Sequence, residues 1–163
     1  MDVSFPKSIR GLTLIELILV MIVTSVLAVV VLVKWPGAEM SLAAQAEQLA
    51  NDIRYTQALA MTKGQRFYLI QASSTTYQIK DSAGTAVKFA TGNTTVTLNA
   101  GTTFGTLTNL PNSLVTFDGK GTPYTDTTSP GTALATAATI PLTANGQTES
   151  VVISPETGRV IIQ

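Results

Sequence analysis

The sequence predicts an α+β protein in which a long N-terminal helix packs on a C-terminal antiparallel β domain. Two observations predict this class. The chain is apolar from Leu12 to Val33, and it then places apolar residues at three- and four-residue steps, which is the period of an α-helix. From Gln65 onward, short β-branched and aromatic runs alternate with turn residues, which is typical of hairpins. We therefore expect a polar stretch over residues 1–11, a membrane-spanning helix over 12–35, an amphipathic helix over 36–64 and an antiparallel β domain over 65–163.

The amino-acid composition excludes several kinds of functional site. The chain has 163 residues, which fits one modest globular domain plus an additional segment, and it is 45% hydrophobic and only 12% charged. It contains no cysteine and no histidine, which excludes disulfides, cysteine metal sites and the commonest general base. Serines without histidine and scattered carboxylates form no nucleophile and base pair, so we predict no catalytic residue, no metal site and no cofactor. A formal net charge of zero gives no general attraction to nucleic acid.

The first helical segment has the length of a membrane span. From Leu12 to Val33 the only ionisable side chain is Glu16. At about 1.5 Å per residue, this run covers roughly the 30 Å of a bilayer's hydrocarbon core. Lys34 and Trp35 follow it and suit the headgroup layer. The alternative is a buried core helix.

The flanking charges predict the orientation of this span. Lys7 and Arg10 precede it, so the positive-inside tendency places the N-terminus in the cytoplasm. The C-terminal domain would then lie in the periplasm. Lys34 argues weakly for the opposite orientation.

The spacing of apolar residues over 36–64 predicts an amphipathic helix. Pro36 and Gly37 are expected to bend or interrupt the helix at its start, because proline removes a backbone donor. Gly64 is a natural stop, and Lys63 complements the negative end of the helix. The apolar residues that would form its buried face are Leu42, Ala46, Leu49, Ile53 and Ala60.

The remaining chain predicts strands joined by turns. The strand-like runs are RFYLIQ, TYQIK, TTVTL, SLVTF, ATIPLT, ESVVIS and RVIIQ. The stretch from residue 124 to 138 is the longest predicted loop. The sequence DGKGT, residues 118–122, lacks the earlier glycine and the following helix of a phosphate loop, so we interpret it as a hairpin turn. Asp118 and Asp126 lack the alternating acidic residues of a calcium loop.

The N-terminal segment resembles the type III signal of the type IV pilin superfamily, which includes the pseudopilins of type II secretion. The residues that carry the resemblance are the basic leader, Gly11, Thr13, Glu16 and the apolar helix after them. The resemblance implies cleavage after Gly11 by prepilin peptidase, N-methylation of the new terminus at Leu12, and packing of the helices into a filament core. The family usually has phenylalanine where this chain has Leu12.

Glu16 has two possible roles. Cleavage would create an amine on Leu12, and in a bundle of staggered helices the Glu16 carboxylate could meet a neighbour's amine, because a buried pair is tolerable where a single buried charge is very costly. In that role Thr13 and Glu16 belong to the assembly segment. The alternative is that Glu16 stabilises the positive end of its own helix, worth about 0.3 to 1 kcal/mol.

The rest of the chain resembles the minor pilin and pseudopilin group called GspH/FimT. The resemblance implies a pilin-like fold, in which a long helix packs against antiparallel β-sheets. The alternative is that these residues are ordinary core, turn and surface positions. The matching positions are Arg54, Ala58, Phe117, Gly121, Thr157, Gly158 and Arg159.

Together these features predict a minor pilin-like structural subunit of a type II secretion pseudopilus or a type IV pilus, and not an enzyme. Its partners would be other pilins or pseudopilins, prepilin peptidase and an inner-membrane assembly platform. The alternative is a DNA-binding minor pilin for natural transformation, with Arg159 and Lys120 as contacts. Ile161 replaces the second arginine of the G-R-x-R segment, and seven basic face eight acidic residues after Pro36, so DNA binding is disfavoured. A single-span protein with a sensing domain explains the span but not Gly11 with Glu16.

Overall fold

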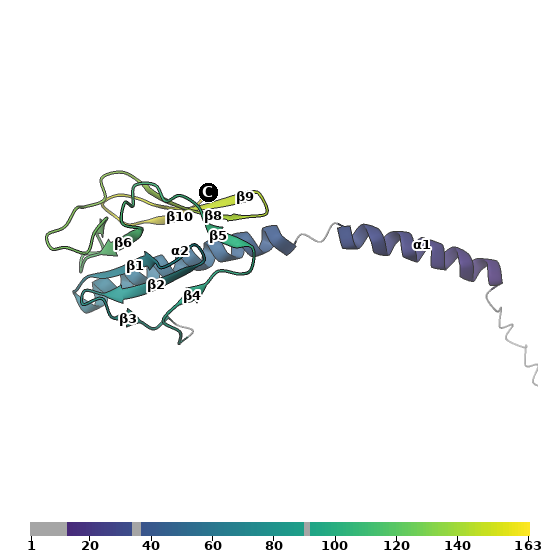
Figure 1. Ribbon diagram of the computed structural model, residues 1–163, viewed down its shortest axis with the longest axis horizontal. Coiled ribbons are helices and arrows are strands. Elements are labelled where there is room, and N and C mark those ends of the chain that lie inside the picture. Colours follow the sequence, from purple (N-terminus) through teal and green to yellow (C-terminus); the bar gives the residue numbers. More distant parts are fainter. Residues whose placement is uncertain (1–12, 34–36, 90–91) are drawn as a thin grey trace, which may run out of the picture. The chain divides into compact units, whose positions relative to one another are not determined.

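The computed structural model describes residues 13–33, 37–89 and 92–163 (Figure 1). The chain divides into two compact units between Pro36 and Gly37, and each is described here by itself. The predicted processing site at Gly11 and Leu12 lies outside the described residues, as do Lys34, Trp35 and Pro36.

Helix α1, Leu14–Val33, makes up the first unit. Its apolar side chains from Leu14 to Val23 are all exposed, with exposed fractions between 47% and 78%. Among the residues that the structure describes, no helix combines the length and the apolar character needed to cross a membrane. The span over residues 12–35 stays a prediction.

Helix α2, Gly37–Lys63, begins the second unit and confirms the amphipathic pattern. It ends at Lys63, immediately before the predicted stop at Gly64. The predicted apolar face is buried, with Leu42 only 2% exposed and Leu49 and Ile53 completely covered. The helix packs against strands of both sheets described below, namely β1, β6, β8, β9 and β10.

Two antiparallel sheets form the rest of this unit (Figure 1). The first has the order β3-β2-β1-β6-β7, with β4 also paired to β2; its strands are β1 (Phe67–Gln71), β2 (Thr76–Asp81), β3 (Ala86–Val87), β4 (Val96–Thr97), β6 (Leu114–Phe117) and β7 (Pro123–Tyr124). The second has the order β10-β9-β8-β5; its strands are β5 (Thr102–Phe104), β8 (Ala138–Ala144), β9 (Gln147–Ile153) and β10 (Val160–Ile162).

One hydrophobic core joins α2 to both sheets. It contains the predicted helix face, the inward residues of the long strands, and an aromatic group in which Tyr77 meets Phe89 and Phe104 edge to face. The inward residues alternate with half-exposed ones along β2 and β8, as expected for strands covered on one face. This arrangement confirms the predicted α+β class, in which a helix packs on antiparallel sheets.

The strand predictions were confirmed, with additions. Each of the predicted runs contains a strand, whereas the two- and three-residue strands β3, β5 and β7 were not predicted. The 118–122 segment is a hairpin turn between β6 and β7, as predicted, and the Asp118 Oδ1 atom accepts the backbone N–H groups of Lys120 and Thr122 at 2.9 Å. Residues 125–137 form the predicted long loop.

Candidate functional site

Thr13 and Glu16 form the N-terminal cap of α1. The Thr13 Oγ1 atom accepts a hydrogen bond from the Glu16 backbone N–H at 3.3 Å, and the Thr13 carbonyl accepts the N–H groups of Glu16 and Leu17 at 3.1 and 3.2 Å. Threonine at the cap with glutamate three residues later is the capping-box pattern. The cap was not predicted, although the T-x-x-E spacing is a signal for it. The structure thus brings two predicted assembly residues together at the helix end and supports a local role for both.

Four of the seven positions that match the GspH/FimT group surround one side chain that was not predicted from the sequence, Gln57 of α2, whereas Ala58 is exposed on the helix. Its Nε2 atom donates hydrogen bonds to the carbonyls of Gly121 and Thr157, each at 2.8 Å. Gly121 ends the β6–β7 turn, and Thr157 lies in the β9–β10 turn. We call this group, formed by Gln57, Gly121, Thr157, Gly158 and the buried ring of Phe117, the Gln57 joint.

Close packing at glycines allows the Gln57 joint to form. A Cβ atom on Gly158 would come within 2.7 Å of both Gln57 Nε2 and Phe117 Cε1, and within 3.1 Å of the Gly121 carbonyl. Gly158 also has a φ of 64°, which side-chain-bearing residues rarely adopt. Gly158 and Phe117 therefore match the family motif because this close packing leaves no room for a side chain at position 158.

Arg54 forms a second contact between α2 and the turn region, here with the sheet that contains β10. Its Nη2 atom donates to the Val160 carbonyl at 3.0 Å, while Nη1 reaches Asn51 Oδ1 at 2.7 Å and Glu47 Oε1 at 3.3 Å. The Glu47 contact is an exposed ion pair, and such pairs contribute little to stability. The bond to Val160, on the edge strand β10, was not predicted.

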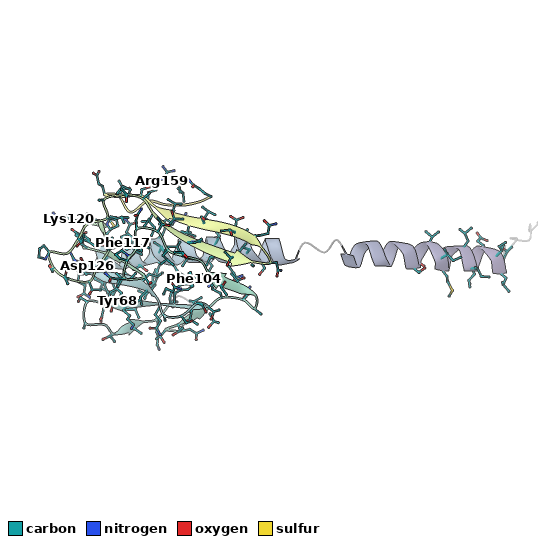
Figure 2. All side chains as sticks on the ribbon, turned by 45° about the horizontal axis from the view of Figure 1, so that its top comes forward. Tyr68, Phe104, Phe117, Lys120, Asp126 and Arg159 are labelled. Carbon is teal, nitrogen blue, oxygen red and sulfur yellow. The ribbon has the colours of Figure 1, made fainter. Side chains whose placement is uncertain are left out.

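Lys120 and Arg159, the candidate DNA contacts, are exposed on the two turns of the Gln57 joint (Figure 2). The Arg159 backbone N–H donates to Thr157 Oγ1 at 3.3 Å. Neither side chain has a carboxylate of the described residues within 4.0 Å. Ile161, at the position of the missing second arginine, is half-buried in β10.

Gln45 attaches the N-terminal half of α2 to the segment that leads into β5. This contact was not predicted from the sequence either. It is 6% exposed; its Nε2 atom donates to Thr102 Oγ1 at 2.9 Å, and its Oε1 atom accepts the Asn99 N–H at 2.6 Å. The sequence contains a signal for this contact, because Gln45 lies on the same helix face as Leu42 and Leu49. A buried glutamine on an apolar face usually has hydrogen-bond partners in another segment.

Asp52 and Tyr77 form a partly buried pair between α2 and β2. The Tyr77 hydroxyl donates to Asp52 Oδ2 at 2.6 Å. Burial raises the pKa of Asp52 above its ordinary value of 3.8, and the hydrogen bond from Tyr77 opposes this rise. Burial, followed by the bond to Asp52, raises the pKa of Tyr77. The pair links the helix to the sheet.

The 125–137 loop is held by two charged residues. The Asp126 carboxylate accepts the backbone N–H groups of Thr128 and Thr132, and these bonds, chiefly those from Thr132, lower the pKa of Asp126. The Arg66 guanidinium lies 4.2 Å from the centre of the Tyr124 ring and donates to the Pro130 carbonyl at 2.6 Å and to the Thr128 carbonyl. Both charged groups bind backbone atoms of the loop, so their role here is to hold the loop's conformation.

Comparison with known families gives two matches. The model of the family described as Type II transport protein GspH matches residues 45–158, and that of the Prokaryotic N-terminal methylation motif matches residues 6–32. No curated protein matches the chain.

Solved structures share the fold. The type IV minor pilin FimU of Pseudomonas aeruginosa is 18% identical, with a TM-score of 0.54 over 77% of this chain and 90% of that one. The minor pseudopilin EpsH of the Vibrio cholerae type 2 secretion system is 15% identical, with a TM-score of 0.55 over 76% of this chain and 96% of that one. At these identities the likeness shows the fold alone. The GspH model, however, spans well over half of the sequence and includes the whole Gln57 joint, so the chain belongs to the GspH family of minor pilins and pseudopilins.

Proposed function

We propose that this protein is a structural subunit that assembles through its N-terminal helix into a type II secretion pseudopilus or a type IV pilus. The observation that carries the proposal is α1, a helix whose apolar side chains from Leu14 to Val23 are exposed all around, with one carboxylate, Glu16, in its first turn. Exposed apolar surface of this extent needs lipid or other apolar helices around it. The match to the methylation motif over residues 6–32 supports the same assignment.

Processing is the first step of the proposed function. Prepilin peptidase would cleave after Gly11 at the cytoplasmic face and leave a methylated Leu12 as the new terminus. The intact mass of protein from membranes with active prepilin peptidase should lack residues 1–11. The full-length mass, or cleavage beyond Val33, would contradict the proposal.

Before assembly, the subunit would be anchored in the bacterial inner membrane by a single span over residues 12–35. The C-terminal domain would lie in the periplasm and would later become part of a periplasmic or surface filament. Its partners would be other pilins or pseudopilins and the inner-membrane assembly platform. Family membership supports anchoring and assembly with related subunits.

DNA binding is the second candidate function, favoured by one observation: the Gln57 joint holds the turns that carry Lys120 and Arg159 against each other. Two cations displace few counterions, so duplex DNA should bind no better than about 10⁻⁴ to 10⁻⁶ M at physiological salt. A gel shift with much tighter affinity, lost in Arg159→Ala, would favour this function.

A further inference from the structure

Met61 is an exposed methionine in the last turn of α2. The described part of the second unit exposes two large hydrophobic side chains, Tyr55 at 36% and Met61 at 54%. The chain has no cysteine, so its sulfur atoms are those of four methionines. A methionine side chain in contact with solvent is open to oxidants. Met61 is therefore a candidate for oxidation.

The Met61 sulfur packs on the β6–β7 turn at Gly121. A Cβ atom on Gly121 would lie 2.9 Å from Met61 Sδ and 3.4 Å from Met61 Cγ. Distances this short mean that the thioether occupies space that the missing side chain of Gly121 leaves free. The same Cβ would lie 3.2 Å from Gln57 Nε2, so the sulfur and the amide nitrogen border one small space. Met61 is therefore a direct neighbour of the Gln57 joint.

The donors of Gln57 are fully used in this arrangement. A side-chain amide nitrogen carries two hydrogens, and Gln57 Nε2 donates to the carbonyls of Gly121 and Thr157, each at 2.8 Å. A thioether sulfur is only a weak acceptor, so Met61 does not compete for these hydrogens. A strong acceptor at the same place would compete, and each hydrogen that it took would release one of the two turns.

Oxidation by a peroxide converts the thioether into such an acceptor. A lone pair of Met61 Sδ attacks one oxygen of hydrogen peroxide and the O–O bond breaks. The departing oxygen takes up the proton of the transferred hydroxyl and leaves as water. The sulfur is thereby oxidised by two electrons to the sulfoxide, the peroxide is reduced, and an apolar side chain becomes a polar one with an additional oxygen atom. At Met61 this oxygen needs room beside Gly121 and can accept a hydrogen bond from Gln57 Nε2.

We propose that Met61 is an oxidation site that controls the Gln57 joint: its sulfoxide draws Gln57 away from the two turns and frees them from α2. The inference goes beyond the proposed function and does not depend on it, because every residue involved belongs to the C-terminal domain. The two turns carry Lys120 and Arg159, so oxidation also ends the fixed placement of these cations. Methionine sulfoxide reductases reverse the reaction, so the change is reversible.

Treatment of the full-length protein in detergent with hydrogen peroxide tests the proposal. Peptide masses should show one added oxygen on the segment that contains Met61. Amide hydrogen exchange should then accelerate at least several-fold in the 118–122 and 154–159 segments, and methionine sulfoxide reductase should restore the original rates. An unmodified Met61, or an oxidised Met61 with unchanged exchange in both segments, would overturn the proposal.

Met61→Leu is the matched control, since leucine has a similar volume and no sulfur. The other methionines, among them Met21 and Met40, stay in this variant, so any effect of their oxidation appears in both proteins. Peroxide should leave exchange in the two segments of Met61→Leu unchanged. The same acceleration as in the native protein would overturn the proposal.

A second variant tests whether the sulfoxide acts through Gln57. In Gln57→Leu the two turns have already lost this donor, so peroxide should oxidise Met61 but accelerate exchange in the two segments several-fold less than in the native protein. An equal acceleration in both proteins would show that oxidation acts by another route, and would overturn the proposal.

Discussion

The side-chain amide of Gln57 occupies the space that a side chain on Gly158 would need. A Cβ on Gly158 would lie 2.7 Å from Gln57 Nε2, the atom that holds the carbonyls of Gly121 and Thr157. The glycine and the glutamine are 101 positions apart in the sequence, yet each limits what the other position can be. Most of the motif positions therefore act together, by fixing two turns to the end of one helix.

Gly158→Ala should therefore destabilise the domain strongly. The substitution adds strain at a φ of 64° and displaces Gln57 or Phe117, for a combined loss of about 2 to 4 kcal/mol. The matched control is Gly146→Ala, where φ is 79° but no atom lies within 4 Å of the added Cβ, so only the strain of about 1 kcal/mol applies. Denaturant unfolding of residues 38–163 measures both. Equal losses would show that the Gly158 contacts do not matter.

Gln57→Leu should separate the two turns from the helix. It removes two hydrogen bonds and leaves the Gly121 and Thr157 carbonyls without this donor, which should cost about 1 to 3 kcal/mol of unfolding free energy. Gln48→Leu, at an exposed position on the same helix, should change stability by less than about 0.5 kcal/mol. Hydrogen exchange at the 118–122 and 154–159 segments should accelerate only in the Gln57 variant. Unchanged exchange there would contradict the assigned contact.

Asp52 should make the domain more stable in mild acid. Its folded-state pKa is raised, so its stabilising contribution is complete below the ordinary value of 3.8 and is lost as the pH rises through the folded-state value. Asp52→Asn can still accept the Tyr77 hydroxyl bond but cannot titrate. The unfolding free energy of the native protein minus that of Asp52→Asn should therefore rise as the pH falls from 7 toward 4. Asp126 shifts the opposite way, but it is present in both proteins and cancels. A flat difference would contradict the raised pKa.

The sequence predicted what depends on local pattern. The spacing of Leu42, Leu49 and Ile53 defined the buried face of α2, and β-branched runs located every strand longer than three residues. Strands β3, β5 and β7 have two or three residues each and were missed, whereas the equally short β4 and β10 were found because each lies within a longer β-branched run. They form because a longer neighbouring strand offers them hydrogen-bond partners.

The Gln57 joint could be predicted only in part. The glycines and Phe117 were found through family resemblance, but Gln57 itself appears in the sequence as one polar residue on a helix. Its role depends on two turns that are 64 and 100 positions away. Polar residues on a buried helix face, such as Gln45, are the better signal, because burial requires partners for their amide groups.

The two roles of Glu16 can be separated by three substitutions. In the lone subunit Glu16 lies about one turn inside α1, where Thr13 already caps its N–H group. Glu16→Ala and Glu16→Leu should insert, be cleaved after Gly11 and accumulate normally, because losing a carboxylate only makes the segment more apolar. Glu16→Gln is the informative control, since glutamine also completes a capping box but carries no charge.

If Glu16 pairs with the amine of a neighbouring subunit, all three variants should be incorporated poorly, because breaking a buried pair costs on the order of 3 to 5 kcal/mol. If Glu16 serves only the end of its own helix, Glu16→Gln should be incorporated like the native protein, and Glu16→Ala should lose only the 0.3 to 1 kcal/mol or so of a helix-end charge. Sheared filaments probed for each variant, with membrane levels as the reference, measure this directly. We expect Glu16→Gln to fail with the other two, because the amine of a neighbouring subunit, once buried among apolar helices, needs a charged partner. Its normal incorporation would assign Glu16 to the helix end.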